Sequence, residues 1–310
     1  MRLAVTGASG FVGGALCRAA VAAGHEVLAF GRRARLDSAH VAGADYLSWD
    51  ITSGPLATPP QVDAVVHCAG SVTDHGRPAE LLAANRDGTR AVLAAFGLAA
   101  RFVHVSTASV YDPLVPTVRA RESEADGVRH RDAYGYSKAA AEQVVRALRP
   151  DAIILRPHAV YGPGDTTLLP RLLDAVRHGR LIAVGTGRQL LALTAIGNLT
   201  AACLLAAGAA DEISGTFNVT DATPLTLDDA LRSFIDARGL QARPVYLPLR
   251  AALPLAAVAE AAARVTGREP RLTRYTVRHL ALERTLDISA ACDRLGYRPL
   301  ATSFDGAARW

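Results

Sequence analysis

The chain has 310 residues, of which 50% are hydrophobic, and a formal net charge of +5 at pH 7. A chain of this size can bury a large core, and its scattered basic residues, with no basic stripe interleaved with aromatic residues, argue against nucleic-acid binding. The four cysteines are far apart and form no Cys-x-x-Cys pair, which predicts a reducing compartment, the cytoplasm, and no metal site.

The first strand is expected at residues 2–6, a short apolar and β-branched run. It leads into Gly7-Ala8-Ser9-Gly10-Phe11-Val12-Gly13, and an amphipathic helix is expected to follow to about residue 23. The glycines allow a tight turn and the close approach of a pyrophosphate to the helix N-terminus. This order of strand, glycine-rich turn and helix predicts a dinucleotide site. Because the strand starts at residue 2, we expect no signal peptide.

The second strand, expected at residues 26–30, is followed by Gly31-Arg32-Arg33. Folds that bind NAD carry an acidic residue at the end of this strand, which binds the ribose 2′-hydroxyl, and none is present here. Two guanidiniums suit bidentate contact with a 2′-phosphate. The sequence therefore predicts NADP(H) as the cofactor. The alternative is that Arg32 and Arg33 belong to a solvated turn.

Further strands are expected at residues 45–48, 64–68, 101–106 and 152–155, with helical stretches between them. This alternation predicts an α/β fold, a doubly wound parallel sheet of the Rossmann type with right-handed crossovers. The segment 112–132 has no clear periodicity and is interpreted as a loop that contacts the substrate.

The single lysine of the chain, Lys138, follows Tyr134 by four residues in a helix expected at residues 133–149. Of the 34 Lys and Arg residues the other 33 are Arg, so the lysine marks a position where we expect a guanidinium not to work. Residues four apart share a helix face, and an ammonium beside a phenol lowers the phenol's pKa toward the range used in acid–base catalysis at neutral pH. The alternative is an ordinary surface Tyr and Lys.

Several motifs make the chain similar to the extended short-chain dehydrogenase/reductase family over nearly its whole length. Besides the loop from Thr6 to Gly13, they are Asp50-Ile51, His67-Cys68-Ala69-Gly70, Asn85-Arg86-Asp87-Gly88-Thr89 and Val105-Ser106-Thr107-Ala108-Ser109-Val110-Tyr111.

The resemblance implies a catalytic triad. Tyr134 exchanges a proton with the substrate oxygen, Lys138 lowers the pKa of Tyr134 and binds the nicotinamide ribose, and Thr107 orients the reacting group. Ser106 and Ser109 are alternatives for the hydroxyl. Thr107 is alternatively a capping residue at the end of a strand.

The resemblance also implies two sets of binding residues, and His158 in the first set is alternatively a core histidine that donates to the backbone. For the cofactor they are Gly7, Ser9, Gly10, Phe11, Val12, Gly13, Arg32, Arg33, Asp50, Ile51, Cys68, Ala69, Gly70, Asn85, Val105, Pro157, His158 and Val160. For the substrate they are Val72, Thr73, Ser109, Tyr161 and Leu168.

Departures from the sugar-nucleotide branches of the family narrow the expectation. Ala108 and Ser109 replace the Asp-Glu pair of sugar 4,6-dehydratases, and Ala159 replaces an Asn of epimerases. Leu191 and Ala192 replace an Arg-Asp pair that binds a diphosphate. The chain is instead similar to the 3β-hydroxysteroid dehydrogenase-like group, which includes bacterial β-keto acid reductases, in residues 155–165, 268–273 and 287–299.

By analogy with the family, residues 1–163 and about 195–220 form an NADP-binding Rossmann domain. Residues 164–194 and 221–310 then form a smaller C-terminal α/β cap that binds the substrate, with helices expected at 225–238 and 254–265. The apolar stretch 253–265 is shorter than the roughly 20 residues that span a bilayer, so it is expected to be a packed cap helix and no membrane partner is expected; the alternative is an interfacial role.

The sequence thus predicts an NADP(H)-dependent oxidoreductase that interconverts a ketone and a secondary alcohol on a hydrophobic small molecule, such as a keto-acyl, polyketide or steroid-like substrate. The alternative enzyme is a nucleotide-sugar epimerase or 4-ketoreductase, with Arg180 or Arg188 at the diphosphate. The non-enzymatic alternative is a dinucleotide-sensing regulator, against which the intact Thr107, Tyr134 and Lys138 set argues. The resemblance also implies a homodimer through helices at 79–95 and 133–149.

Overall fold

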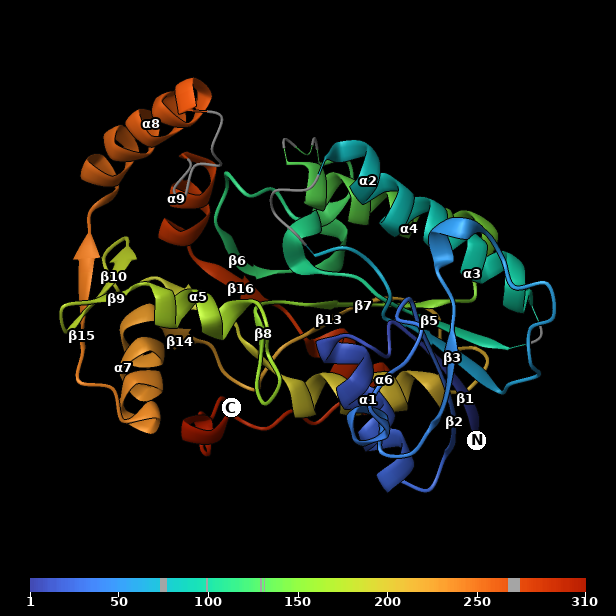
Figure 1. The fold of residues 1–310 in the computed structure, drawn as a ribbon. Coiled ribbons are helices and arrows are strands. Elements are labelled where there is room, and N and C mark those ends of the chain that lie inside the picture. The colour runs from blue at the N-terminus through green and yellow to red at the C-terminus, as the bar shows by residue number, and fades with distance from the viewer. Residues whose placement is uncertain (73–76, 99, 129, 131, 267–273) are drawn as a thin grey trace.

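The structure is a computed structural model, and the residues it describes are 1–72, 77–98, 100–128, 130, 132–266 and 274–310. Thr73 and the motif at 268–273 therefore lie outside the described residues. A parallel sheet between two layers of helices forms one lobe, and a second group of strands and helices lies beside it (Figure 1).

Seven parallel strands form the central sheet, in the order β13-β7-β5-β4-β1-β2-β3. The chain adds strands in one direction from β1 to β3 and in the opposite direction from β4 onward, so the strand order reverses between β1 and β4. Open α/β sheets bind ligands at such a point, at the carboxyl ends of their strands. The predicted α/β Rossmann sheet is therefore confirmed. The strands are β1 (Arg2–Thr6), β2 (Glu26–Gly31), β3 (Asp45–Ser48), β4 (Ala64–His67), β5 (Arg101–Val105), β7 (Ile153–Pro157) and β13 (Gly215–Val219).

Helices cover both faces of this sheet, so the strand residues are buried on both sides except in the edge strand β3, which is mostly exposed. Leu3 and Val5 pack into the core on one face, and Ala4 and Val65 pack into the core on the other. The first face carries α1 (Phe11–Ala22), α6 (Ile196–Ala207) and α10 (Ser289–Arg294). The second carries α2 (Pro78–Leu82), a π-helical turn (Ala83–Asp87), α3 (Gly88–Phe96) and α4 (Ala133–Leu148).

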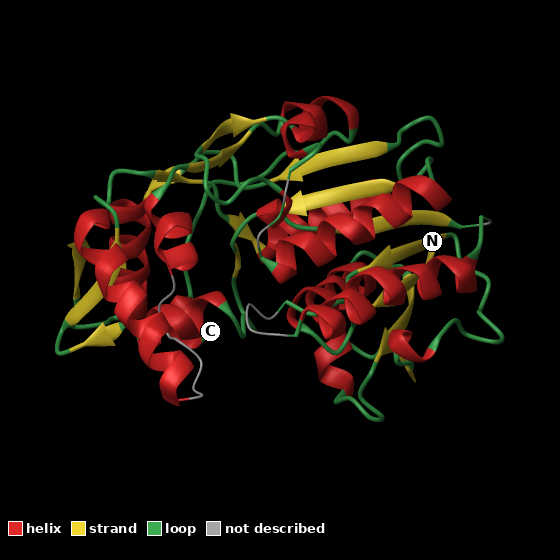
Figure 2. Cartoon of the chain, turned by 90° about the horizontal axis from the view of Figure 1, so that it is seen from above, coloured by secondary structure: helices red, strands yellow, loops and turns green. Residues whose placement is uncertain are grey.

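Within the described residues, the second lobe contains two small sheets with helices packed beside them (Figure 2). One sheet consists of β9 (Val176–Arg177), β10 (Arg180–Val184) and β15 (Arg243–Leu247), and the other of β14 (Leu225–Thr226), β11 (Leu190–Leu191), β16 (Arg284–Leu286) and β6 (Thr117–Ala120). The helices are α5 (Leu168–Asp174), α7 (Leu227–Arg238), α8 (Leu249–Thr266) and α9 (Arg274–Ala281). A short pair, β8 (Val160–Tyr161) and β12 (Thr194–Ala195), links the lobes.

Two expectations about the second lobe need correction. The segment 112–132 contains β6 and a short 3₁₀ helix (Glu122–Ala125), because β6 pairs with β16, which is more than 160 residues away and invisible to local periodicity. Helix α8 starts at Leu249, not at Pro254. A proline in the second turn removes only one hydrogen bond, so the helix continues through it.

The chain also returns to the Rossmann lobe near its end. Ala291, Leu295 and Tyr297 lie in the same core cluster as the first face of the sheet, although residues 221–310 were expected in the cap. The division at residue 163 otherwise stays a prediction. Within the described ranges, no helix has the length and apolar character of a membrane span.

Candidate active site

The loop between β1 and α1 packs closer to its neighbours than a side chain would allow. Gly7 has φ +73°, and a Cβ atom on it would lie 2.7 Å from the amide nitrogen of Ala69. A Cβ atom on Gly13 would lie 2.3 Å from the carbonyl oxygen of Gly7. Glycine at both positions therefore lets the ends of β1 and β4 meet the start of α1.

The N-terminus of α1 opens at this loop. Its cap residue is Gly10, which offers no side-chain acceptor to the first N–H groups of the helix. Such N–H groups and the helix dipole favour a phosphate, so the residues present fit the pyrophosphate of a dinucleotide. The other predicted cofactor residues around this turn are Ser9, Phe11, Val12, Cys68, Ala69 and Gly70.

The predicted adenosine-binding residues lie at the ends of β2 and β3. Arg32 and Arg33 follow β2 and are exposed. The N–H group of Thr52 donates to the Asp50 carboxylate at 3.0 Å. This bond and the Thr52 hydroxyl, with a smaller effect from the charge of Arg32, lower the pKa of Asp50. Ile51 is buried in the 3₁₀ turn that Asp50 caps. The predicted adenosine-binding residues therefore all lie at the carboxyl ends of β2 and β3.

Buried polar side chains connect β1 to the second helix layer. The Thr6 hydroxyl lies 2.7 Å from Nδ1 of His67, and Nε2 of His67 lies 2.9 Å from the Thr89 hydroxyl. The Thr89 hydroxyl donates to the backbone oxygen of Asn85. Asn85 lies in the π-helical turn, a distortion that is frequent at functional sites.

Asn85 in turn connects the segment after β4 to α4. Its Oδ1 accepts the N–H of Ser71 at 2.7 Å, and its Nδ2 donates to the oxygen of Ser71 at 3.0 Å and to the Ser137 hydroxyl at 2.8 Å. Sequence analysis assigned Asn85 to the site but missed Thr6, Thr89 and Ser137. Thr6 and Thr89 belong to the quoted family motifs and Ser137 lies between Tyr134 and Lys138, but none of the three was assigned to the site.

Tyr134 lies in the first turn of α4, where the helix approaches the end of β5. Asp132 caps the helix by accepting the N–H of Gly135 at 2.5 Å. A Cβ atom on Gly135 would lie 2.6 Å from the carbonyl oxygen of Ser109. The glycine next to Tyr134 therefore permits the approach that brings this helix to the segment carrying Thr107.

Lys138 lies one turn after Tyr134 and is only 6% exposed. Its Nζ donates to the carbonyl oxygen of Val105 at 2.8 Å. Burial lowers the pKa of Lys138 to about 8, against the opposing attraction of the Glu142 carboxylate. Burial, and then the charge of Lys138, lower the pKa of His67 and of His104, so both histidines stay neutral beside it.

Thr107 follows β5 and caps a short 3₁₀ helix (Ala108–Val110). The N–H of Ser109 donates to the Thr107 hydroxyl at 3.1 Å, and the Thr107 hydroxyl donates to the Ser109 hydroxyl at 3.2 Å. The capping role considered for Thr107 is thus present, and its side chain remains partly exposed. Ser106 is 5% exposed and donates to Glu142, which favours Thr107 as the hydroxyl available to a ligand.

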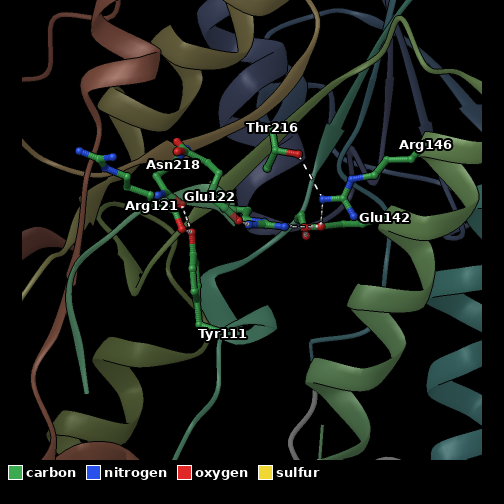
Figure 3. A network of polar contacts seen from close by, with 9 residues as sticks. Tyr111, Arg121, Glu122, Glu142, Arg146, Thr216 and Asn218 are labelled. Carbon is green, nitrogen blue, oxygen red and sulfur yellow. Dashed lines mark hydrogen bonds and ion pairs between the residues drawn. The ribbon is translucent and has the colours of Figure 1, made fainter. Parts of the chain in front are cut away.

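A buried ion pair lies one turn beyond Lys138. Glu142 and Arg156 are each 1% exposed, and Arg156 donates to the two carboxylate oxygens of Glu142 at 3.0 and 2.7 Å. Arg146 also donates to this carboxylate, and Figure 3 shows the two side chains directed toward each other. Burial would raise the pKa of Glu142, but the Arg156 guanidinium outweighs it and the pKa is lowered. The pair joins α4 to β7.

The same network orders the segment before α4. Arg156 donates to the backbone oxygen of Glu122 at 2.7 Å, and the Glu122 carboxylate accepts the N–H of Asn218 at 2.8 Å. The Tyr111 hydroxyl donates to Asn218 Oδ1 at 2.8 Å (Figure 3). The segment expected to contact substrate is therefore anchored to the central sheet.

Glu142→Gln is expected to lower the free energy of unfolding by about 3–5 kcal/mol, because the amide leaves the buried charge of Arg156 without its partner. Urea unfolding followed by circular dichroism measures the loss. The control is Glu80→Gln, since Glu80 is 66% exposed in its ion pair with Arg77 and contributes little. Equal stability of Glu142→Gln and the wild type would contradict the prediction.

A small pocket lies between the segment that follows Thr107 and the strands β6 and β16. His158 is part of its wall, and its Nδ1 lies 2.5 Å from the carbonyl oxygen of Ala192, the contact expected of a histidine that donates to the backbone, while its assignment to the cofactor stays a prediction. Arg284, which sequence analysis missed, donates to backbone oxygens of the segment 112–115. The pocket is lined by Ala108, Ser109, Tyr111, Pro113, Thr117, His158, Arg284 and Leu286.

The remaining predicted residues are not among those that line this pocket. Tyr161 is 1% exposed and donates to Asp221 at 3.0 Å, in an apolar cluster that Leu168 also contacts. Val72 is 58% exposed at the surface. Pro157 ends β7 and Val160 begins β8, where the chain leaves the central sheet.

Fold and site together define a Rossmann-type protein with a glycine-rich nucleotide loop. The model of the NAD dependent epimerase/dehydratase family matches residues 3–220, and the chain belongs to this family of extended short-chain dehydrogenases/reductases, as the motifs predicted.

Individual relatives agree with this assignment. A 2-alkyl-3-oxoalkanoate reductase of Stenotrophomonas maltophilia is 31% identical over 326 positions, covering 100% of this chain and 98% of the relative. A 4-hydroxy-2-methyl-3-oxo-4-farnesyl-3,4-dihydroquinoline-1-oxide ketoreductase of Stigmatella aurantiaca is 32% identical, covering 99% and 95%. The structure of UDP-glucuronic acid 4-epimerase from Bacillus cereus in complex with NAD has a TM-score of 0.74 at 21% identity, covering 99% and 94%, which shows a shared fold.

Proposed function

We propose that the protein is an NADP(H)-dependent oxidoreductase that interconverts a ketone and a secondary alcohol on a hydrophobic substrate. The observation that carries the proposal is the buried Lys138, which donates to Val105 at 2.8 Å and lies one helical turn from Tyr134 at the carboxyl end of β5. A phenol beside such an ammonium can act as a general acid and base near neutral pH. The reductase and ketoreductase names of the two relatives support this reaction class.

The glycine loop and the N-terminus of α1 would hold the pyrophosphate of the cofactor, and Arg32 and Arg33 its 2′-phosphate. Asp50 would contact the adenine, and Lys138 the nicotinamide ribose. When bound, a nicotinamide dinucleotide supplies or accepts the hydride.

The side chains of this protein donate and accept the proton of the reaction. In the direction of reduction, Tyr134 gives its proton to the substrate oxygen, and the Thr107 hydroxyl donates a hydrogen bond to the same atom. The positive charge of Lys138 stabilises the phenolate that Tyr134 becomes. In the direction of oxidation the same groups act in reverse, with Tyr134 as the base.

Residue types around the site bear on the substrate class. Ala108, Pro113 and Leu286 contribute apolar surface to the pocket, whose wall also contains the polar residues Ser109, Tyr111, Thr117, His158 and Arg284. Leu191 and Ala192 are apolar where nucleotide-sugar epimerases carry a pair that binds diphosphate, which favours a reductase over the epimerase alternative.

The test is oxidation of NADPH and of NADH by the purified protein with β-keto esters, steroid ketones and sugar nucleotides. We expect turnover with hydrophobic ketones and higher catalytic efficiency with NADPH. Higher efficiency with NADH would overturn the cofactor assignment. Turnover of sugar nucleotides alone would overturn the substrate class.

A further inference from the structure

Two hydroxyl groups meet where a side chain at position 31 would begin. A Cβ atom on Gly31, the last residue of β2, would lie 2.8 Å from the Ser9 hydroxyl and 2.8 Å from the Tyr46 hydroxyl. Gly31 does not have a left-handed φ, so its backbone would accept another residue. A side chain at position 31 would therefore have to displace these two hydroxyls, which come from different elements.

Tyr46 comes from β3, the strand next to β2. Its neighbour across the pair is Ala29, and its hydroxyl extends past the end of β2 to donate to the carbonyl oxygen of Arg33 at 2.7 Å. Burial raises the pKa of Tyr46, with the Ser9 hydroxyl and Arg33 opposing, so the phenol keeps its proton and remains a donor. The hydroxyl thus holds the backbone of Arg33 in place beside the glycine loop.

We propose that Tyr46 is a positioning residue for cofactor selectivity, an inference that rests on the proposed NADP(H)-dependent function. By holding Arg33, it orients the guanidiniums toward a phosphate on the adenosine 2′-oxygen. Together with Ser9, it also fills the space that an acidic side chain at position 31 would need to bind a free 2′-hydroxyl.

The physical reason is preorganisation. Arg32 and Arg33 are long, exposed side chains that lose conformational freedom when they bind a phosphate. Fixing the backbone from which one of them extends removes part of that cost before the ligand arrives. The gain in affinity applies to a ligand that carries the 2′-phosphate and not to a ligand without one.

Titration calorimetry with 2′-phospho-ADP-ribose and with ADP-ribose tests this without turnover. Tyr46→Phe is expected to weaken binding of the 2′-phosphorylated ligand about tenfold, the value of one hydrogen bond, and to leave ADP-ribose binding unchanged. Tyr246→Phe is the matched control, because Tyr246 donates to Asp228 in the cap at 2.6 Å and should alter neither affinity. Thermal unfolding of each variant shows whether it is folded.

A second set of variants tests the space at position 31. Gly31→Asp alone is expected to weaken both ligands, since its Cβ atom would clash with two oxygens. Adding Ser9→Ala and Tyr46→Phe removes those oxygens and is expected to restore ADP-ribose binding at least tenfold relative to Gly31→Asp. Full ADP-ribose affinity in Gly31→Asp alone would overturn the steric part of the inference.

The outcomes separate this inference from the proposed function. If the wild type binds ADP-ribose more tightly than its 2′-phosphorylated form, the NADP(H) assignment fails and the role of Tyr46 fails with it. If the wild type prefers the 2′-phosphorylated ligand and Tyr46→Phe keeps the same ratio of affinities, only the role of Tyr46 is overturned.

Discussion

Tyr134→Phe is expected to lower kcat by about 10²–10⁴-fold while leaving the affinity for NADPH unchanged. The variant keeps the ring and loses only the proton that the substrate oxygen must receive. Lys138, which lies one turn away and donates to Val105, would remain in place and continue to contact the cofactor. Initial rates of NADPH oxidation measure the loss, and quenching of protein fluorescence by NADPH measures binding.

The same helix offers a matched control for this variant. Tyr136 is two residues further along α4, is 51% exposed, and therefore points away from the site. Tyr136→Phe is expected to retain wild-type turnover. Retained turnover in Tyr134→Phe, or an equal loss in both variants, would contradict the role proposed for Tyr134.

Lys138→Arg, although it conserves charge, is expected to lose nearly as much turnover as Lys138→Ala. The lysine is 6% exposed and packs where its ammonium reaches the carbonyl oxygen of Val105. A planar guanidinium is larger and spreads its charge over a fork, so it cannot occupy this space in the same geometry. The Glu142 carboxylate one turn further along would also attract it away from Tyr134. Steady-state kinetics of the two variants and the wild type provide the comparison.

The pH dependence of wild-type turnover distinguishes the effect of the charge of Lys138 from the effect of its shape. Burial lowers the pKa of Lys138 to about 8, so in the free protein the ammonium is present below that pH and is lost as the pH rises through it. We expect kcat/KM for reduction to fall above pH 8. If charge were sufficient, Lys138→Arg would match the wild type at pH 7 and exceed it at pH 9, because a guanidinium stays charged. Such activity would overturn the prediction.

The fold was predictable from sequence because its signals are local. Apart from the exposed edge strand β3, the strands of the sheet are short, mostly apolar runs that are buried on both faces, and they alternate with helices as the crossover rules require. The glycine loop is recognisable because its close backbone contacts require glycine. A Cβ atom on Gly7 or Gly13 would lie too close to neighbouring backbone atoms. Strand β6 was missed because its pairing partner, β16, lies far away in the sequence.

The site was predictable only in part, for a related reason. Tyr134 and Lys138 lie four residues apart, and helix geometry alone places them on one face. The ion pair of Glu142 and Arg156 joins a helix to a strand, and the sequence of neither segment predicts the other as its partner. Tyr161 illustrates the opposite error: its family motif implied a substrate contact, but packing of the second lobe buries it against Phe304.

By itself, the sequence determined the parallel Rossmann sheet, the nucleotide loop and the relation between Tyr134 and Lys138, because each depends on backbone geometry over a few consecutive residues. Only the tertiary structure decided what surrounds them: the burial of Lys138 against Val105, the chain from Thr6 through His67 to Asn85, and the two hydroxyls above Gly31. Those contacts join distant segments, and packing and hydrogen-bond satisfaction across the whole core select them.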